Sequence, residues 1–207
     1  MFRLLARRGA GSMAIEAMLA QCGAAYEVED LVRNSDGSLP EHLHRINPRG
    51  EVPTLLLPDD SVMTESAAIM IWLADKYPKA GLAPDPISPL RAQYLRWMVY
   101  LATTVYMSDL RMYYPERFTT DAASTAGIKA FALSGIAREF EIYADALGDG
   151  PFILGNQMSA TDIYAAMLLS WVPDMAETFG RHPNLKTMYD RVVAVPAIAK
   201  VWERNGV

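Results

Sequence analysis

A proline-rich segment at residues 77–89 most constrains how this chain of 207 residues can fold. It holds prolines at positions 78, 84, 86 and 89, and such a segment is stiff and extended. Before it, short apolar runs of strand length alternate with helical patterns, whereas every periodic segment after it is typical of a helix. We therefore expect an α/β domain at residues 1–78, a linker at 79–89 and an all-helical domain at 90–207.

The apolar patterns predict the order β-α-β-α-β-β-α for the first domain. Strands are expected at residues 2–6, 26–32, 53–57 and 61–63, and helices at 13–21, 40–46 and 65–76. In the second domain, helices are expected at residues 90–114, 121–147, 161–172, 184–193 and 197–204. Ser12 and Thr64 are expected to cap the helices that follow them.

Charge and cysteine content narrow the class of function. The net charge of −5 argues against nucleic-acid binding, which needs clustered Lys and Arg. No apolar run reaches the roughly 18 residues of a membrane span, and residues 1–8 are too short and interrupted for a signal peptide. Cys22 is the only cysteine, and His42 and His44 have no companion ligands, so we expect neither an internal disulfide nor a metal site. A cytoplasmic protein is the simplest interpretation.

Two short stretches predict a binding site for a peptide-like anion. Val52-Pro53 opens an apolar run, and proline has no N–H, so it belongs at the start or the edge of a strand. Glu65-Ser66 lies in the first turn of an expected helix. A helix N-terminus attracts a carboxylate through its free N–H groups and its dipole.

These stretches, in their order and spacing, resemble the soluble glutathione transferase superfamily over essentially the whole chain. Val52-Pro53 resembles the family's valine before a cis-proline, whose backbone pairs with the cysteinyl part of glutathione. Glu65-Ser66 resembles its acidic-Ser pair, which holds the γ-glutamyl group, and Ser159-Ala160-Thr161-Asp162 resembles its N-capping box, for which we expect a folding role. The resemblance implies a thioredoxin-like N-terminal domain, an all-helical C-terminal domain and glutathione as co-substrate.

The segment that would activate the glutathione thiol departs from the family's pattern. It resembles the bacterial beta-type segment Pro-Gly-Ala-Cys-Ser-Leu-Ala, but Gly11 stands at the cysteine and Ala6 at that subgroup's tyrosine. Ser12 matches the serine, so the resemblance implies a catalytic hydroxyl that donates to the thiolate, with Arg7 or Arg8 adding positive potential. Alternatively, Ser12 only caps the first helix and the arginines are solvated. The missing cysteine argues against mixed-disulfide chemistry.

The remaining ligand contacts are expected on one loop and on the first long helix of the second domain. Arg49 either reaches the glycyl carboxylate of glutathione or is a solvated loop charge. The pocket for a second substrate is expected at Tyr106, Arg111, Tyr113 and Tyr114.

The resemblance implies an enzyme that conjugates the glutathione thiolate to small, mostly apolar electrophiles, with a role in detoxification. It also implies a homodimer. Two alternatives stay open. The absent side chains at Ala6 and Gly11 suit a glutathione- or ligand-binding homologue without turnover, and an interaction module could keep only the fold.

Overall fold

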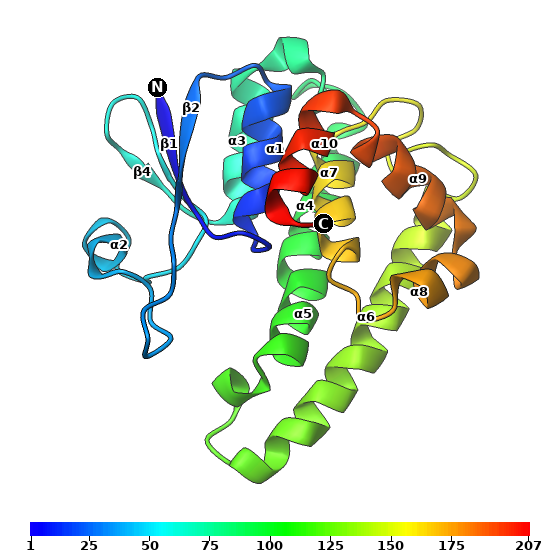
Figure 1. Ribbon diagram of the computed structural model, residues 1–207. Helices are drawn as coiled ribbons and strands as arrows, with labels where there is room; N and C mark the ends of the chain where they lie inside the picture. Colours follow the sequence, from blue (N-terminus) through cyan, green and yellow to red (C-terminus); the bar gives the residue numbers. More distant parts are fainter. The chain divides into compact units, whose positions relative to one another are not determined.

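The computed structural model describes all 207 residues, whose contacts group into two compact units (Figure 1). The sheet unit comprises Met1–Ala83 and Val193–Val207, and the helical unit comprises Pro84–Val192. The predicted domain limits at residues 78 and 90 stay a prediction. By its contacts, however, the last helix of the chain groups with the N-terminal unit and not with the other helices.

The sheet unit is built on a mixed four-stranded sheet of order β2-β1-β3-β4. Its strands are β1 (Phe2–Ala6), β2 (Tyr26–Asp30), β3 (Thr54–Leu56) and β4 (Val62–Met63). The central strand β1 pairs in parallel with β2 and antiparallel with β3, which in turn pairs antiparallel with β4. The predicted order of strands and helices is confirmed.

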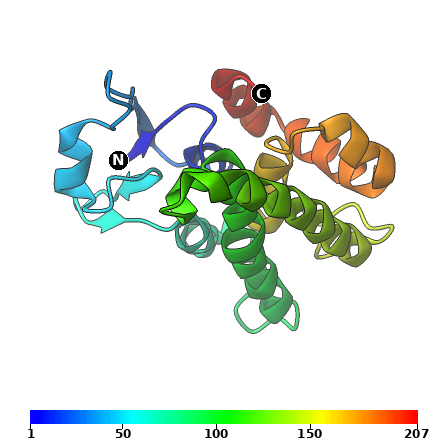
Figure 2. The same ribbon diagram turned by 90° about the horizontal axis from the view of Figure 1, so that it is seen from below.

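Helices cover both faces of this sheet. Figure 2 shows α2 (Glu41–Ile46, light blue) on one side of the strands, and α1 (Ser12–Gln21) and α3 (Ser66–Lys76) on the other. Successive strand residues point to opposite faces, so the neighbours Leu4 and Leu5, both fully buried, serve different layers. Leu5 packs with Leu43 of α2 in a small apolar cluster.

The last helix completes the sheet unit. This helix, α10 (Pro196–Asn205), packs against α1 and buries Ile198, Val201 and Trp202. Its sequence alternates these apolar residues with polar ones at helical spacing, which predicts one buried face.

The helical unit contains the remaining long helices. They are α4 (Arg91–Tyr100), the π-helical segment η2 (Leu101–Val105), α5 (Tyr106–Tyr113), α6 (Thr125–Leu147), α7 (Ala160–Leu169), α8 (Met175–Arg181) and α9 (Pro183–Val193). Short 3-10 turns occur at η1 (Pro78–Ala80), η3 (Pro115–Phe118) and η4 (Ala122–Ser124). None of the helices is both long enough and apolar enough to cross a membrane.

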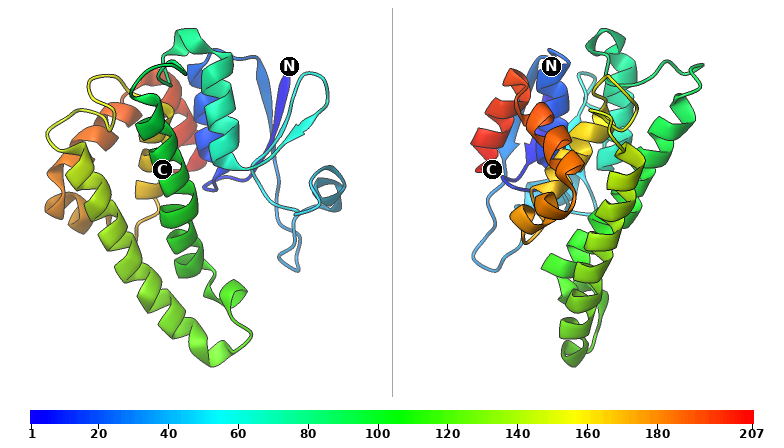
Figure 3. Two further views of the ribbon diagram at one scale, coloured as in Figure 1. Left: turned by 180° about the vertical axis from the view of Figure 1, so that it is seen from behind. Right: turned by 90° about the vertical axis from the view of Figure 1, so that its right-hand side faces the viewer.

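Two features of the helical unit differ from the sequence prediction. The helix expected at residues 90–114 runs on without a gap, but η2 interrupts its α-helical geometry between α4 and α5 (Figure 3). The helix α8 was not predicted, because its seven residues are too few to show a clear apolar period.

The predicted capping box at the start of α7 is present. Asp162 Oδ2 accepts a hydrogen bond from the Ser159 N–H (2.8 Å), and Oδ1 accepts one from the Ile153 N–H (2.9 Å). Burial raises the pKa of Asp162 to about 6, although these hydrogen bonds oppose the rise. The box therefore anchors both the helix and the loop before it.

Candidate functional site

The Val52–Pro53 peptide bond at the start of β3 is cis. Pro53 is buried, and the turn before it is held by Asn47, whose Nδ2 donates to the Glu51 carbonyl (3.0 Å) and to the Thr54 hydroxyl (3.0 Å). Asn47 is itself buried and was missed from sequence, because only its place at the end of α2 hints at this role. The turn therefore holds the Val52 backbone in place.

Gly50 in the same turn is required by close packing. Its φ is +61°, and a Cβ built there would lie 2.0 Å from the ring of His44. Any other residue at this position would be strained and would have to displace the His44 ring. His42, on the same helix, lies 2.7 Å from Glu29 Oε1. No three His, Cys, Asp or Glu side chains of the chain come together as metal ligands.

Glu65 and Ser66 stand at the N-terminal end of α3, beside the cis-proline turn. β3 and β4 pair Leu55 with Met63, and Pro53 lies two residues before Leu55 while Glu65 lies two residues after Met63, so the two pairs stand at the same end of this antiparallel strand pair. Glu65 is exposed and Ser66 is half-buried. The structure thus brings the two predicted glutathione-binding pairs together within the sheet unit.

The predicted helix cap at Thr64 is wrong. The cap position is Glu65, which has φ 64° and ψ 102° and makes no side-chain capping bond. A non-glycine residue with positive φ is strained, and such strain collects at functional sites. Glu65 therefore combines an exposed carboxylate with a strained backbone at the start of α3.

Arg49 lies in an exposed loop near these residues. Its guanidinium donates to Glu51 Oε2 from both Nε (3.0 Å) and Nη2 (2.9 Å). The hydrogen bond to Glu51, then the charges of Glu51 and Glu65, raise the pKa of Arg49. A carboxylate that binds Arg49 must therefore compete with Glu51.

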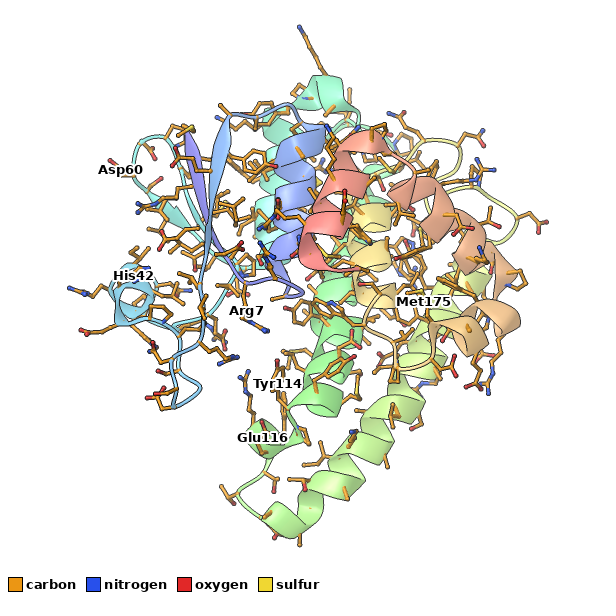
Figure 4. All side chains as sticks on the ribbon, in the orientation of Figure 1. Arg7, His42, Asp60, Tyr114, Glu116 and Met175 are labelled. Carbon is orange, nitrogen blue, oxygen red and sulfur yellow. The ribbon has the colours of Figure 1, made fainter.

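Ser12 is the first residue of α1, and its predicted capping role is wrong. The cap position is Gly11, and the Ser12 side chain makes no capping bond. Instead its hydroxyl accepts from the Arg7 N–H (3.1 Å) and donates to the Arg7 carbonyl (3.0 Å). Ser12 is 1% exposed. The hydroxyl therefore closes the turn between β1 and α1, where Figure 4 labels Arg7.

Two backbone N–H groups at the same turn, both on buried residues, have no hydrogen-bond partner within the protein. No hydrogen bond within the protein has the N–H of Gly11 or Ser12 as its donor, although the Ala10 and Met13 N–H groups are both bonded. The first N–H groups of a helix have no partner in the helix itself and can bind an anion. The turn can thus stabilise negative charge without any side chain.

One of the two arginines at this turn, Arg8, forms an ion pair through its side chain. Arg8 makes an exposed ion pair with Asp30 (3.4 Å), and Asp30 also accepts from Arg204 Nη1 (2.7 Å).

Cys22 is not a competing nucleophile, since burial raises the pKa of its thiol to about 11 and keeps it protonated at neutral pH.

The residues predicted for the second substrate all lie in the helical unit. Tyr106 packs edge-on against Trp171, with ring centroids 5.3 Å apart, and the Tyr113 hydroxyl donates to the Trp171 carbonyl. The Arg111 guanidinium lies over the ring of Phe118, at 5.2 Å. Tyr114 ends α5, and Figure 4 labels it there. Tyr106 and Tyr113 therefore share one neighbour, while Arg111 contacts the turn η3 instead.

Comparisons with known proteins agree with this arrangement. Residues 12–76 match the family model of the glutathione S-transferase N-terminal domain, and residues 108–205 match that of its C-terminal domain. The uncharacterized GST-like protein YncG of Escherichia coli (strain K12) is 29% identical over 198 residues, which cover 95% of each chain. Glutathione S-transferase GstA of Escherichia coli O157:H7 is 26% identical over 82% of this chain and 81% of its own.

Solved structures show the same fold. A glutathione transferase homologue from Sulfitobacter, crystallised with bound glutathione, is 25% identical and has a TM-score of 0.89 over 100% of this chain and 99% of its own. A glutathione transferase from Methylococcus capsulatus is 25% identical, with a TM-score of 0.85 over the same shares. On its sequence, its fold and these matches, the chain belongs to the glutathione S-transferase family.

Proposed function

We propose that the chain is a glutathione transferase that joins the glutathione thiolate to small, mostly apolar electrophiles. One observation carries the proposal: within the sheet unit, the cis Val52–Pro53 turn lies at the same end of the β3–β4 strand pair as Glu65 and Ser66 at the N-terminal end of α3. The Sulfitobacter homologue that binds glutathione supports it, because its fold matches over the whole chain.

Each part of glutathione has a matching group in this arrangement. The Val52 backbone offers an N–H and a carbonyl for the cysteinyl residue. Ser66 and the N-terminal end of α3 suit the γ-glutamyl carboxylate, and the exposed Glu65 carboxylate suits the γ-glutamyl ammonium. Arg49 is the proposed partner of the glycyl carboxylate, in exchange for its ion pair with Glu51.

Thiol activation has two candidate donors at the turn before α1. The N–H groups of Gly11 and Ser12 are unbonded and stand at a helix N-terminus, which lowers a thiol pKa. The Ser12 hydroxyl is the second candidate, but it must first leave the Arg7 carbonyl. We favour the N–H groups for this reason. In the reaction, the thiol proton passes to solvent, the sulfur lone pair bonds to the electrophilic carbon, and a leaving group departs with its bonding electrons.

The second substrate, the assembly and the location are further parts of the proposal. We assign Tyr106, Arg111, Tyr113 and Tyr114 to the electrophile, a homodimer as the assembly, detoxification as the role and the cytoplasm as the location. Membership of the family supports the dimer. A monomer mass by light scattering at micromolar concentration would contradict it.

Titration calorimetry and a conjugation assay test the central proposal. We expect glutathione to bind, and 1-chloro-2,4-dinitrobenzene or another electrophile of a panel to be conjugated with release of the leaving group. Ser66→Ala should weaken binding about tenfold, whereas Ser61→Ala, in the exposed β3–β4 hairpin, should not. Absence of glutathione binding refutes the proposal, and tight binding without turnover favours the non-catalytic alternative.

A further inference from the structure

The C-terminal turn of α10 reaches back to the turn before α1. Asn205 is buried and bridges three elements. Its Oδ1 accepts a hydrogen bond from the Gly9 N–H (3.2 Å), and its Nδ2 donates to the Val201 carbonyl within α10 (2.8 Å) and lies 3.4 Å from Glu16 Oε2 of α1. The Asn205–Gly9 bond joins residues that are 196 positions apart in the chain and that both belong to the sheet unit.

The turn that Asn205 contacts is otherwise held mainly by its own residues. The Ala10 N–H donates to the Arg7 carbonyl (3.1 Å), and the Ser12 hydroxyl bonds both backbone groups of Arg7. Gly9, at φ +65°, has open space around it and no other hydrogen-bond partner for its N–H. Apart from the exposed ion pair of Arg8, Asn205 therefore provides the one polar contact from another element that reaches this turn.

A partly buried ion pair, between Arg204 and the buried Glu16, holds the end of α10 that carries Asn205. Glu16 on α1 is 4% exposed, and its carboxylate accepts from Arg204 Nε (2.7 Å) and Nη2. Arg204 also donates to Asp30 at the end of β2 (2.7 Å). A two-pronged arginine–carboxylate pair sets both distance and orientation, and a buried carboxylate tolerates the loss of its partner poorly. Hydrogen-bonded ion pairs therefore connect the end of α10 to α1 and to β2, close to the turn between β1 and α1.

We propose that Asn205 is a positioning residue for thiol activation, held in place by Arg204: by fixing Gly9 it sets the N–H groups of Gly11 and Ser12 toward the glutathione sulfur. The inference rests on the proposed function for the identity of the ligand. It gives the C-terminal turn of the chain a role in the proposed glutathione site of the sheet unit. Neither residue touches the substrate.

Amide hydrogen exchange measured by NMR tests the contact without any ligand. In the wild type, the Gly9 amide should exchange at least about tenfold more slowly than in an unstructured peptide, because Asn205 alone bonds it. Asn205→Ala should remove this protection. Lys200→Ala, at an exposed position of α10, should change nothing. Unprotected Gly9 in the wild type, or protection that survives Asn205→Ala, overturns the proposal.

Titration of the thiol of bound glutathione tests whether the Asn205–Gly9 hydrogen bond affects thiol activation. The thiolate of bound glutathione absorbs near 240 nm, so its pKa can be measured in each variant. Asn205→Ala should raise that pKa by about 0.5 or more, while the glutathione Kd changes less than about threefold, since the groups at positions 52–53 and 65–66 are untouched. An unchanged thiol pKa in a variant that binds glutathione overturns this inference alone. A wild type that binds no glutathione refutes the proposed function, and the exchange experiment then still decides the Asn205–Gly9 contact.

Discussion

The Ser12 hydroxyl is bonded to both backbone groups of a single residue, Arg7, accepting from its N–H at 3.1 Å and donating to its carbonyl at 3.0 Å. These two hydrogen bonds close the turn between β1 and α1, and the hydroxyl proton is used in the bond to the Arg7 carbonyl. A serine in this arrangement orders the backbone around the proposed thiol site. It reaches the sulfur only by giving up the bond to the Arg7 carbonyl.

Ser12→Ala should therefore act mainly on stability. Removing the hydroxyl leaves the Arg7 N–H without its partner, while the Arg7 carbonyl keeps only its bond from the Ala10 N–H, so we expect the free energy of unfolding to fall by about 1–3 kcal/mol. The conjugation rate, kcat/KM, should fall less than about tenfold, because the backbone donors remain. Urea denaturation and steady-state kinetics check this, with Ser134→Ala on an exposed position of α6 as control. A loss of about a hundredfold or more with unchanged stability would identify the hydroxyl as the donor.

Glu65→Gly should raise the stability of the protein but weaken its binding of glutathione. Glu65 has φ 64° and makes no capping bond, so glycine relieves backbone strain and should raise the free energy of unfolding by up to about 1 kcal/mol. The variant loses the carboxylate proposed for the γ-glutamyl ammonium, and glutathione should bind about tenfold or more weakly.

Asp60→Gly is the matched control for that variant. Asp60, in the β3–β4 hairpin, is the other non-glycine residue with positive φ, at 65°. Glycine there should relieve the backbone equally and leave the glutathione Kd unchanged in calorimetry. Equal losses of affinity in both variants would show that Glu65 contributes no specific contact.

Asp109→Asn should flatten the dependence of stability on pH. Asp109 on α5 is 1% exposed, and neither carboxyl oxygen has a hydrogen-bond partner. Burial, and then the charge of Glu139 on α6, raise its pKa well above the ordinary value. As pH rises above about 4, the unfolded chain releases this proton before the folded chain does, so the wild type loses stability by up to about 1.4 kcal/mol per pH unit.

Urea denaturation between pH 4 and pH 8 measures this effect. We expect the asparagine variant to lose less stability than the wild type over that range and to be the more stable protein at pH 8. Asp190→Asn removes an exposed carboxylate paired with Lys186 and should leave the pH slope unchanged. Parallel slopes for wild type and Asp109→Asn would contradict a buried, protonated Asp109.

Asp162→Ala should cost more than the loss of an ordinary helix cap. The variant leaves the buried N–H groups of Ile153 and Ser159 without their acceptor, so the free energy of unfolding should fall by about 2–4 kcal/mol. Asp174→Ala removes an exposed cap that accepts from the Glu177 N–H (2.7 Å) and should cost about 1 kcal/mol. Equal costs in thermal or urea denaturation would show that burial of the capping box adds nothing.

Local sequence patterns account for the structural features that were predicted correctly. The order of strands and helices follows from apolar periods of two and 3.6 residues, and the capping box from a Ser and an Asp three positions apart. The predicted capping roles of Ser12 and Thr64 were wrong, because a cap depends on backbone angles that residue type alone does not specify.

The sequence by itself determined the family, the mixed fold and the two pairs, Val52-Pro53 and Glu65-Ser66, that suggest a glutathione site. The tertiary structure decided what surrounds them: Asn47 behind the cis-proline turn, the Ser12 hydroxyl bonded to Arg7, and Asn205 bonded to Gly9. The reason is physical. A hydrogen bond forms only when donor and acceptor come within about 3 Å, and for partners 196 residues apart nothing in the local sequence brings them there; only the packing of α10 against α1 does.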